Sequence, residues 1–423
     1  MNPLRSARLA FDLLAAEGPA ALARRAADRL AEQADRNSFA PAQDWPRAAA
    51  IPTLYVLATS PSPRLGGVQA QLVARRARER LAGRPFALFY PWAGRYRLEL
   101  EHGGERAALD LAPAPAGPVG PPAEPEPGPW VRAIRDAFAW AGASTLRIEG
   151  VAGLPFTGLL ELSAALPLTL AIHDFALFCP RPHLFEEPAG CFCRWSRDLA
   201  RCTSCLRQTW PVPFDYQALR RTLAARLLRG SERAVFPSSF LRDAHLELFS
   251  TLDLARCRID PPPLLSRPVP DYRPAEPPRR IAFVGAAKRF KGADLFADVV
   301  ARLAPRHPEI EWHAFGGGEP QILRGFRAAG IEVHGYYRAG TLPALLARHR
   351  IDLALLLSIV PESYGLTLDE CALAHVPFLT FDHGAQAERA GALGGRVVPL
   401  ALGAAGVAER IASALSRESP VAA

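Results

Sequence analysis

The segment 361–370, PESYGLTLDE, carries two carboxylates, Glu362 and Glu370, on either side of a glycine. An apolar run at 351–359 precedes it, so the sequence predicts a strand, a glycine-containing turn and then the start of a helix. Such a turn directs backbone N–H groups toward an anion. Carboxylates would repel a phosphate, but they accept hydrogen bonds from hydroxyls of the same ligand. The segment therefore predicts a sugar-nucleotide site, and the alternative is a pair of solvated glutamates on an ordinary loop.

Both lysines of the chain, Lys288 and Lys291, lie in one short turn, GAAKRFKG, although lysine and arginine together number 50. Lysine carries a compact point charge, whereas arginine presents a planar fork. In a chain so rich in arginine, we interpret the two lysines as residues that face a phosphate. The alternative is that their position reflects chance.

Two further features follow apolar runs that have the length of strands. His173 ends the run at 168–172, and ligands of parallel sheets bind at the carboxyl ends of the strands, so this histidine is predicted to face a ligand. The alternative is that it only caps its strand. Gly66 and Gly67 follow the run at 53–58, where they would let backbone approach a ligand closely or simply form a tight turn.

Five of the seven cysteines lie within 27 residues and include a C-x-C and a C-x-x-C pattern. Clustered thiols in a cytoplasmic chain predict a metal site rather than disulfides. We expect a structural zinc held by four of the five, with an iron–sulfur cluster or free cysteines as alternatives. The candidate ligands are Cys179, Cys191, Cys193, Cys202 and Cys205.

Length and composition set wider bounds. A chain of 423 residues exceeds one typical core, so two domains are expected. We find no run of 18 apolar residues and no leader-like start, and therefore expect a cytoplasmic protein. The net charge of +8 is compatible with nucleic acid, an anionic membrane surface or phosphorylated ligands. Because the sequence lacks basic clusters with interleaved aromatic residues, we expect no nucleic-acid partner.

Alternating strand and helix patterns predict an α/β chain with two doubly wound, Rossmann-like domains that face each other across a cleft. The predicted segments are an N-terminal helical extension, an amino-terminal domain with a cysteine-rich insertion, a proline-rich hinge, a carboxyl-terminal domain and a terminal helix with a tail. Their ranges are 1–50, 51–262 with the insertion at 179–205, 263–278, 279–403 and 404–423.

The motifs in the carboxyl-terminal half resemble those of retaining glycosyltransferases with the GT-B fold, in the group 1, or family 4, class. The resemblance rests on FVGAAKRFKG, then AFGGGEP, then the two glutamates of the opening segment, in that order. It is closest to bacterial transferases that build surface polysaccharides. The amino-terminal half resembles them more loosely, through LGGVQ, IHDFALFCPR and AVFPSSF.

The resemblance implies a UDP- or GDP-sugar donor, a glycan or lipid-linked saccharide acceptor, and contact with the inner membrane surface at most. Lys291 would neutralise the donor diphosphate, Glu362 would hold the transferred sugar, and Glu370 would bind the ribose. His173 would face the sugar, and no catalytic metal is expected. The other donor-binding positions would be Gly66, Gly67, Gly285, Lys288, Arg289, Gly316, Gly365 and Leu366.

Two positions depart from the pattern that the resemblance implies. Ala286 stands where an arginine is usual, so that Lys288 or Arg289 would reach the phosphate instead, and His375 replaces a glycine near the end of the motif helix. Two other interpretations remain: a basic, zinc-binding nucleic-acid module, and a GT-B relative that acts as an epimerase or a phosphorylase.

Overall fold

The computed structural model describes residues 12, 14–41, 51–61, 67–114, 121 and 127–416. It divides into two compact units. The carboxyl-terminal unit contains the described residues up to Ala31, the short stretch Gly190–Phe192 and the residues from Leu264 onward. The amino-terminal unit contains the remainder. None of the helices in the described ranges combines the length and the apolar character that a membrane crossing needs.

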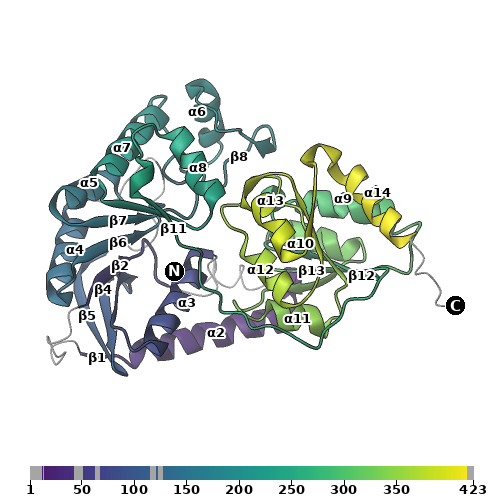
Figure 1. Ribbon diagram of the computed structural model, residues 1–423, viewed down its shortest axis with the longest axis horizontal. Helices are drawn as coiled ribbons and strands as arrows, with labels where there is room; N and C mark the ends of the chain where they lie inside the picture. Colours follow the sequence, from purple (N-terminus) through teal and green to yellow (C-terminus); the bar gives the residue numbers. More distant parts are fainter. Residues whose placement is uncertain are drawn as a thin grey trace. The chain divides into compact units, whose positions relative to one another are not determined.

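A single parallel sheet of six strands forms the centre of the carboxyl-terminal unit (Figure 1). The strands lie in the order β14-β13-β12-β15-β16-β17. The chain thus builds outward from β12 in one direction, returns, and builds outward in the other, which is the 3-2-1-4-5-6 order of dinucleotide-binding sheets. The strands are β12 (Arg280–Val284), β13 (Glu311–Phe315), β14 (Glu332–Gly335), β15 (Leu353–Leu356), β16 (Phe378–Phe381) and β17 (Gly395–Val398).

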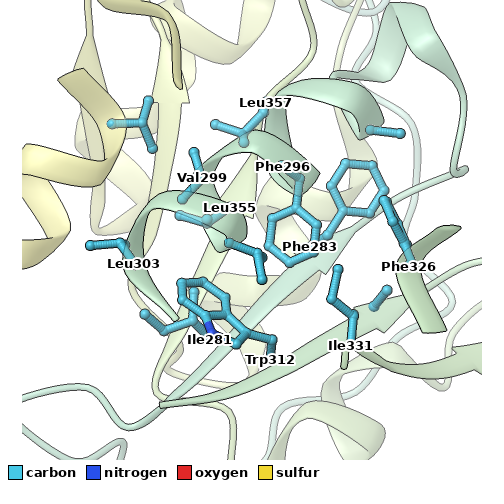
Figure 2. Packing of buried hydrophobic residues seen from close by; sticks show 14 of the residues in the cluster. Ile281, Phe283, Phe296, Val299, Leu303, Trp312, Phe326, Ile331, Leu355 and Leu357 are labelled. Carbon is cyan, nitrogen blue, oxygen red and sulfur yellow. The ribbon is translucent and has the colours of Figure 1, made fainter. Parts of the chain in front are cut away.

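Alternate residues of these strands pack against helices on opposite faces of the sheet, as the pleat requires. Phe283 of β12 belongs to the cluster formed with α9, α10 and α14, and Figure 2 shows it beside Phe296 and Phe326. Its neighbours Ala282 and Val284 belong to a second cluster, with α11 and α12. The helices are α9 (Ala293–Leu303), α10 (Pro320–Ala328), α11 (Leu342–Arg348), α12 (Leu366–Leu373), α13 (Gly384–Ala390) and α14 (Gly403–Leu415).

The amino-terminal unit has a nine-stranded sheet in the order β1-β5-β4-β3-β2-β6-β7-β10-β11. Its pairs are parallel except for the antiparallel meander β3-β4-β5. The strands are β1 (Ala40–Pro41), β2 (Thr53–Val56), β3 (Phe86–Trp92), β4 (Arg95–His102), β5 (Glu105–Pro113), β6 (Thr145–Glu149), β7 (Leu168–Ala171), β10 (Arg233–Phe236) and β11 (Cys257–Ile259).

Within the described residues, five helices connect the strands of this sheet and surround it (Figure 1). They are α3 (Gly67–Leu81), α4 (Pro127–Ala141), α5 (Phe156–Ala165), α7 (Tyr216–Gly230) and α8 (Ser239–Leu248). The cysteine segment adds the two-residue strands β8 (Phe185–Glu186) and β9 (Cys191–Phe192) and the helix α6 (Leu199–Arg207). Asp198 begins α6, because its carboxylate accepts hydrogen bonds from the backbone N–H groups of Ala200 and Arg201.

The predicted fold class is confirmed, since both sheets are doubly wound and parallel at their centres. Helix α2 (Pro19–Asn37) begins at a proline, directly after Gly18, whose φ is 87°. The apolar run at 351–359 is a strand only over β15, because its last residues turn into the loop that leads to Glu362. Helix α13 and strand β17 were not predicted.

His375 adopts the left-handed conformation that explains why glycine is usual at this position. Its φ is 57°, directly after the last turn of α12, and the side chain is exposed. Its backbone N–H donates to the carbonyl of Ala372, which completes the helix end. A Cβ in this conformation costs about 1–2 kcal/mol, of which the larger chain entropy of glycine would offset a part.

We therefore expect His375→Gly to stabilise the folded chain by about 0.5–1 kcal/mol. This corresponds to a rise of roughly 1–4 °C in the melting temperature, measured by thermal unfolding. His375→Ala is the matched control, since it removes the imidazole but keeps the Cβ. An equal rise for both variants would show that the side chain, and not the backbone conformation, causes the cost.

Candidate active site

The order of strands in the carboxyl-terminal unit places two loops next to each other. The loop after β12 and the loop after β15 leave adjacent strands and continue in opposite directions along the sheet. Open α/β sheets bind ligands at such a reversal, outside the carboxyl ends of the strands. The first loop contains Lys291 and the second contains Glu362, so the topology brings together two residues that are 71 positions apart.

Lys291 and Glu362 form an ion pair in which Nζ lies 2.5 Å from Oε1. The two side chains are 30% and 20% exposed, so solvent and ligand have access to both. The backbone of Glu362 is fixed on both sides. Its N–H donates to Oε1 of the buried Gln386 at 2.8 Å, and its carbonyl accepts from the N–H of Ala385.

Hydrogen bonds also join the backbones of the two loops. The carbonyl of Phe290 accepts from the N–H of Ile359 at 3.0 Å. Gly292, with a φ of 80°, ends the lysine turn against the second loop, and a Cβ there would lie 1.9 Å from the carbonyl oxygen of Leu357. A glycine is required at this position because any other residue would push the loops apart.

The loop after β13 approaches the lysine turn in the same way. A Cβ on Gly316 would lie 2.0 Å from the carbonyl oxygen of Gly285, the residue that follows β12. Further along, Ala287 donates to the carbonyl of Gly317 and accepts from the N–H of Glu319. Gly316, one of the glycines predicted to bind the donor, thus allows two loops to run in contact, whereas a Cβ at Gly285 would meet nothing within 4 Å.

Helix α12 begins at the glycine turn that the sequence predicts. Gly365 has a φ of 79°, and Leu366 is the first helical residue. The N–H groups of a first helical turn have no acceptor within their own helix. Arg389 holds the turn in place, because it donates to the carbonyl of Tyr364 at 2.9 Å and to the carboxylate of Asp369 at 2.5 Å.

Glu370 is buried in α12, with 8% of its surface exposed. Its Oε1 accepts a hydrogen bond from Ser266 Oγ at 2.9 Å. Burial raises the pKa of Glu370 to about 7, although the hydrogen bonds from Ser266 and from the backbone of Gly340 oppose the rise. The carboxyl group is therefore close to half ionised at neutral pH.

The remaining basic residues of the lysine turn lie at its surface. Lys288 precedes the short 3₁₀ turn Arg289–Lys291, and its Nζ lies 5.6 Å from the ring centre of Phe290. Arg289 forms an exposed ion pair with Asp294 at 3.2 Å.

In the amino-terminal unit, His173 follows β7 and is held by a carboxylate that sequence reasoning missed. Its Nε2 lies 2.6 Å from Oε2 of Glu149, the last residue of the adjacent strand β6. Arg147 donates to the other oxygen of Glu149 at 2.7 Å. Burial disfavours ionised Glu149, but Arg147 and His173 outweigh it and hold its pKa well below the ordinary value. Nδ1 of His173 is buried and lacks a hydrogen-bond partner among the described residues.

The two glycines predicted near the start of the chain differ in what the structure says of them. Gly66 lies outside the described residues. Gly67 is the exposed first residue of α3.

Four of the five clustered cysteines line one small cavity of the amino-terminal unit, and Cys191 is exposed and does not line it. Burial raises the pKa of the Cys179 thiol to about 12. Within the described ranges, the sulfur atoms do not approach one another to 4.8 Å in any group of three. The cavity-lining cysteines are Cys179, Cys193, Cys202 and Cys205.

Several residues of the site carried no recognisable signal in the sequence. Gln386 and Arg389 lie on α13, a helix that was not predicted, and they act on the opening segment only through the fold. Ser266 lies in the proline-rich segment that was assigned as a hinge. Glu149 could have been found as the polar residue that ends its strand, by the same argument that found His173.

Residues 278–417 match the family described as "Glycosyl transferases group 1". The match covers the parallel sheet of the carboxyl-terminal unit, with Lys291, Glu362 and Glu370. It identifies a glycosyltransferase domain, and the chain is therefore an enzyme of the transferase class. No curated protein matches the sequence.

Solved structures with similar folds cover most of the chain. Sucrose-phosphate synthase from Thermosynechococcus elongatus is 15% identical, with a TM-score of 0.58 over 86% of this chain and 90% of that chain. Anabaena HepE in complex with UDP and glucose is 12% identical, with a TM-score of 0.52 and coverages of 87% and 90%. WaaG, a glycosyltransferase involved in lipopolysaccharide biosynthesis, is 13% identical, with a TM-score of 0.54 and coverages of 86% and 90%. These similarities establish the GT-B fold.

The raised pKa of Glu370 predicts a specific pH dependence of stability. A carboxyl group whose pKa is raised to about 7 in the folded state binds its proton more tightly there than in the unfolded chain. The contribution of this group to the free energy of unfolding is therefore complete below about pH 4.5 and is lost as the pH rises through about 7.

We expect Glu370→Gln, which stays neutral at all pH values, to gain stability relative to the wild type between pH 4.5 and 8. The gain has an upper bound of about 3 kcal/mol and is measured as the difference in melting temperature across this range. The exposed Glu409→Gln on α14 serves as the control and should follow the wild type. A constant difference between Glu370→Gln and the wild type would contradict the raised pKa.

Proposed function

We propose that the chain is a retaining glycosyltransferase that moves a sugar from a UDP- or GDP-sugar to a glycan or lipid-linked acceptor in bacterial surface-polysaccharide synthesis. The observation that carries the proposal is the contact between Lys291 and Glu362 at the reversal of strand order. A cation that can face a diphosphate lies beside a carboxylate that can accept hydroxyl hydrogen bonds. This is the pair of functions that a sugar nucleotide needs.

Lys291 would act on the leaving group. Breaking the bond between sugar and diphosphate builds up negative charge on the phosphate, and a fixed cation at that point lowers the barrier. The start of α12, with Gly365 and Leu366, would add backbone N–H groups and the positive end of a helix dipole. The leaving group needs no metal ion in this scheme. Lys288 and Arg289 would supply further positive charge at the edge of the phosphate site.

Glu362 and Glu370 would position the donor and would not act as acid and base at the bond being broken. Lys291 forms an ion pair with Glu362. When a donor binds, its phosphate would take over the lysine, and Glu362 would turn to hydroxyls of the transferred sugar. Glu370 would exchange its contact with Ser266 for hydroxyls of the ribose. Retention would follow from attack on the face that the diphosphate leaves, with a phosphate oxygen accepting the proton of the acceptor.

His173 would bind the transferred sugar. Because Glu149 is ionised, it would accept a hydrogen bond from Nε2–H of the histidine, and in that tautomer Nδ1 is the acceptor of the ring. A sugar hydroxyl is a suitable donor for this buried and otherwise unpartnered nitrogen. Glu149 is thus a positioning residue that acts through His173.

Two observations support the proposed role in surface-polysaccharide synthesis and the proposed location. WaaG, whose fold is similar, is involved in lipopolysaccharide biosynthesis. The net charge of +8 would favour a cytoplasmic enzyme that visits the anionic inner leaflet, where a lipid-linked acceptor is found. The match to a glycosyltransferase family does not favour the nucleic-acid interpretation.

The four cavity-lining cysteines would hold a structural zinc ion. Cys202 and Cys205 lie on α6, whereas Cys179 and Cys193 lie outside that helix, so a bound ion would tie α6 to the rest of the segment. The sulfur atoms would have to move closer together to complete a tetrahedral site, and each bound thiol would lose its proton.

Variants of Lys291 and Glu362 test the proposed function directly. We expect Lys291→Met to lower transfer about 10²–10³-fold and to weaken UDP or GDP binding, because the diphosphate loses its cation. Glu362→Gln should abolish most transfer while nucleotide binding persists, because only the sugar contact is lost. Transfer is measured with a panel of nucleotide sugars selected by thermal stabilisation.

Arg302→Ala, at an exposed position of α9, removes a positive charge away from the loops and should leave both measurements unchanged. Undiminished transfer by both site variants would overturn the assignment of the site. Tight, salt-sensitive binding to duplex DNA without nucleotide affinity would support the nucleic-acid alternative instead.

Cobalt substitution tests the cysteine site. The wild-type chain loaded with Co²⁺ is expected to show thiolate-to-cobalt charge-transfer absorption. Cys205→Ser should lose this absorption, and Cys191→Ser, outside the cavity, should retain it. Absence of the absorption in the wild type would contradict metal binding by these thiols, and the visible colour of an iron–sulfur cluster in the purified protein would favour that alternative.

A further inference from the structure

A second group of metal-ligating side chains lies at the edge of the sheet in the carboxyl-terminal unit, apart from the cysteines. His313 on β13 and His334 on β14 place Nδ1 and Nε2 at a distance of 3.1 Å. An oxygen of Glu332, also on β14, lies 3.4 Å from the same Nδ1. The ligand atoms of all three residues lie within 4.8 Å of one another, and no other group of three within the described ranges meets that spacing.

These distances suit one metal ion. Zinc binds imidazole nitrogen at about 2.0–2.1 Å, so two ligands at a tetrahedral angle lie about 3.3 Å apart. The observed spacings of 3.1 and 3.4 Å from His313 Nδ1 are close to that value. A hydrogen bond between the two rings would also explain the 3.1 Å contact. It would not require a carboxylate at ligand distance from the same nitrogen.

The other ring nitrogen of His313 provides an independent indication. Nε2 is buried and makes no hydrogen bond to the described residues, but it lies 3.8 Å from Oε2 of Glu311. Histidines that bind metal through one nitrogen typically direct the other N–H toward a carboxylate, which fixes the tautomer. Glu311 is itself held by Arg280 at 2.9 Å. The surroundings of His313 therefore have the arrangement of a metal ligand and its supporting carboxylate.

A third imidazole completes the surroundings. The ring of His349, which follows α11, has its centre 4.1 Å from that of His334. Phe315 also stacks on His334, with the two ring centres 4.1 Å apart. The side chain of Glu332 is 60% exposed, so an ion has a path from solvent.

We propose that His313, Glu332 and His334 bind a divalent transition-metal ion, Zn²⁺ by preference. The nitrogen and oxygen ligands suit zinc rather than magnesium or calcium. The ion would join the edge strand β14 to β13. It would bridge the two strands close to the point where their register shifts, between Ala314 and Phe315.

The site is a structural one and is independent of the proposed transferase activity. The proposed metal site nevertheless lies close to an active-site loop. His313 is on β13, the strand that leads into this loop, and the N–H of Gly316 in the loop donates to the carbonyl of Gly335, the last residue of β14, at 3.0 Å. Metal binding should therefore raise thermal stability and should leave nucleotide affinity little changed.

The test uses the full chain, without an affinity tag and treated with a chelator, carrying Cys179→Ser and Cys205→Ser to remove thiolate ligands. We expect one equivalent of Zn²⁺ to bind in a titration and to raise the melting temperature. Glu332→Gln, which changes a side chain that is 60% exposed, should weaken zinc binding at least tenfold. His307→Gln is the matched control, because it alters another histidine–glutamate pair of the same unit, His307 and Glu309 at 3.1 Å.

Co²⁺ absorption in the wild-type chain gives a second measurement if the cysteine variants do not fold. Nitrogen and oxygen ligands produce ligand-field bands without thiolate charge transfer, so the two sites are distinguished in one spectrum. Zinc binding that Glu332→Gln leaves undiminished, or the absence of binding in the cysteine-substituted chain, would overturn the proposal. Neither result would bear on transfer by Lys291 and Glu362.

Discussion

The reversal of strand order between β12 and β15 is the constraint on which the candidate site depends. Neighbouring parallel strands end at the same edge of the sheet, so the loops that follow them meet there. Lys291 therefore lies beside Glu362 although the two residues are 71 positions apart in the sequence. The glycines then become necessary. Gly292 and Gly316 let three loops run in contact where a Cβ would collide with a carbonyl oxygen. Gln386 and Arg389 brace the loop after β15 from α13, so the site is held from both sides.

The same constraint orders the other unit, where the sheet builds outward from β2 in both directions. Glu149 ends β6 and His173 follows β7, so two adjacent parallel strands again deliver two polar side chains to one edge. The difference lies in the charge. In the carboxyl-terminal unit the partly exposed carboxylate of Glu362 faces the cation of Lys291, whereas in the amino-terminal unit the buried carboxylate of Glu149, whose pKa is lowered, contacts His173. In the proposed function, the first pair would exchange partners with a ligand and the second would hold a rigid acceptor.

Many of the strands and several residues of the candidate site could be predicted from the sequence, for a physical reason. The alternation of strands and helices could be predicted, because short apolar runs between glycine and proline signals indicate strands such as β6, β12 and β13. Four candidate site residues could be predicted because they follow such strands closely in the sequence: Lys291, Glu362, Gly365 and Glu370. The supporting residues could not. Ser266 reaches Glu370 over 104 residues, and His313 meets His334 only because β13 and β14 pair, so no local spacing announces either contact.

The ion pair between Lys291 and Glu362 also has a consequence for product release. In the proposed reaction the lysine pairs in turn with two anions, the phosphate of the donor and the carboxylate of Glu362. Once the sugar has been transferred, Glu362 has lost its hydroxyl partners and competes with the nucleoside diphosphate for the same cation. The carboxylate that binds the donor sugar would thereby also promote release of the nucleoside diphosphate. The ion pair between Lys291 and Glu362 would then affect both the turnover rate and the inhibition by free diphosphate.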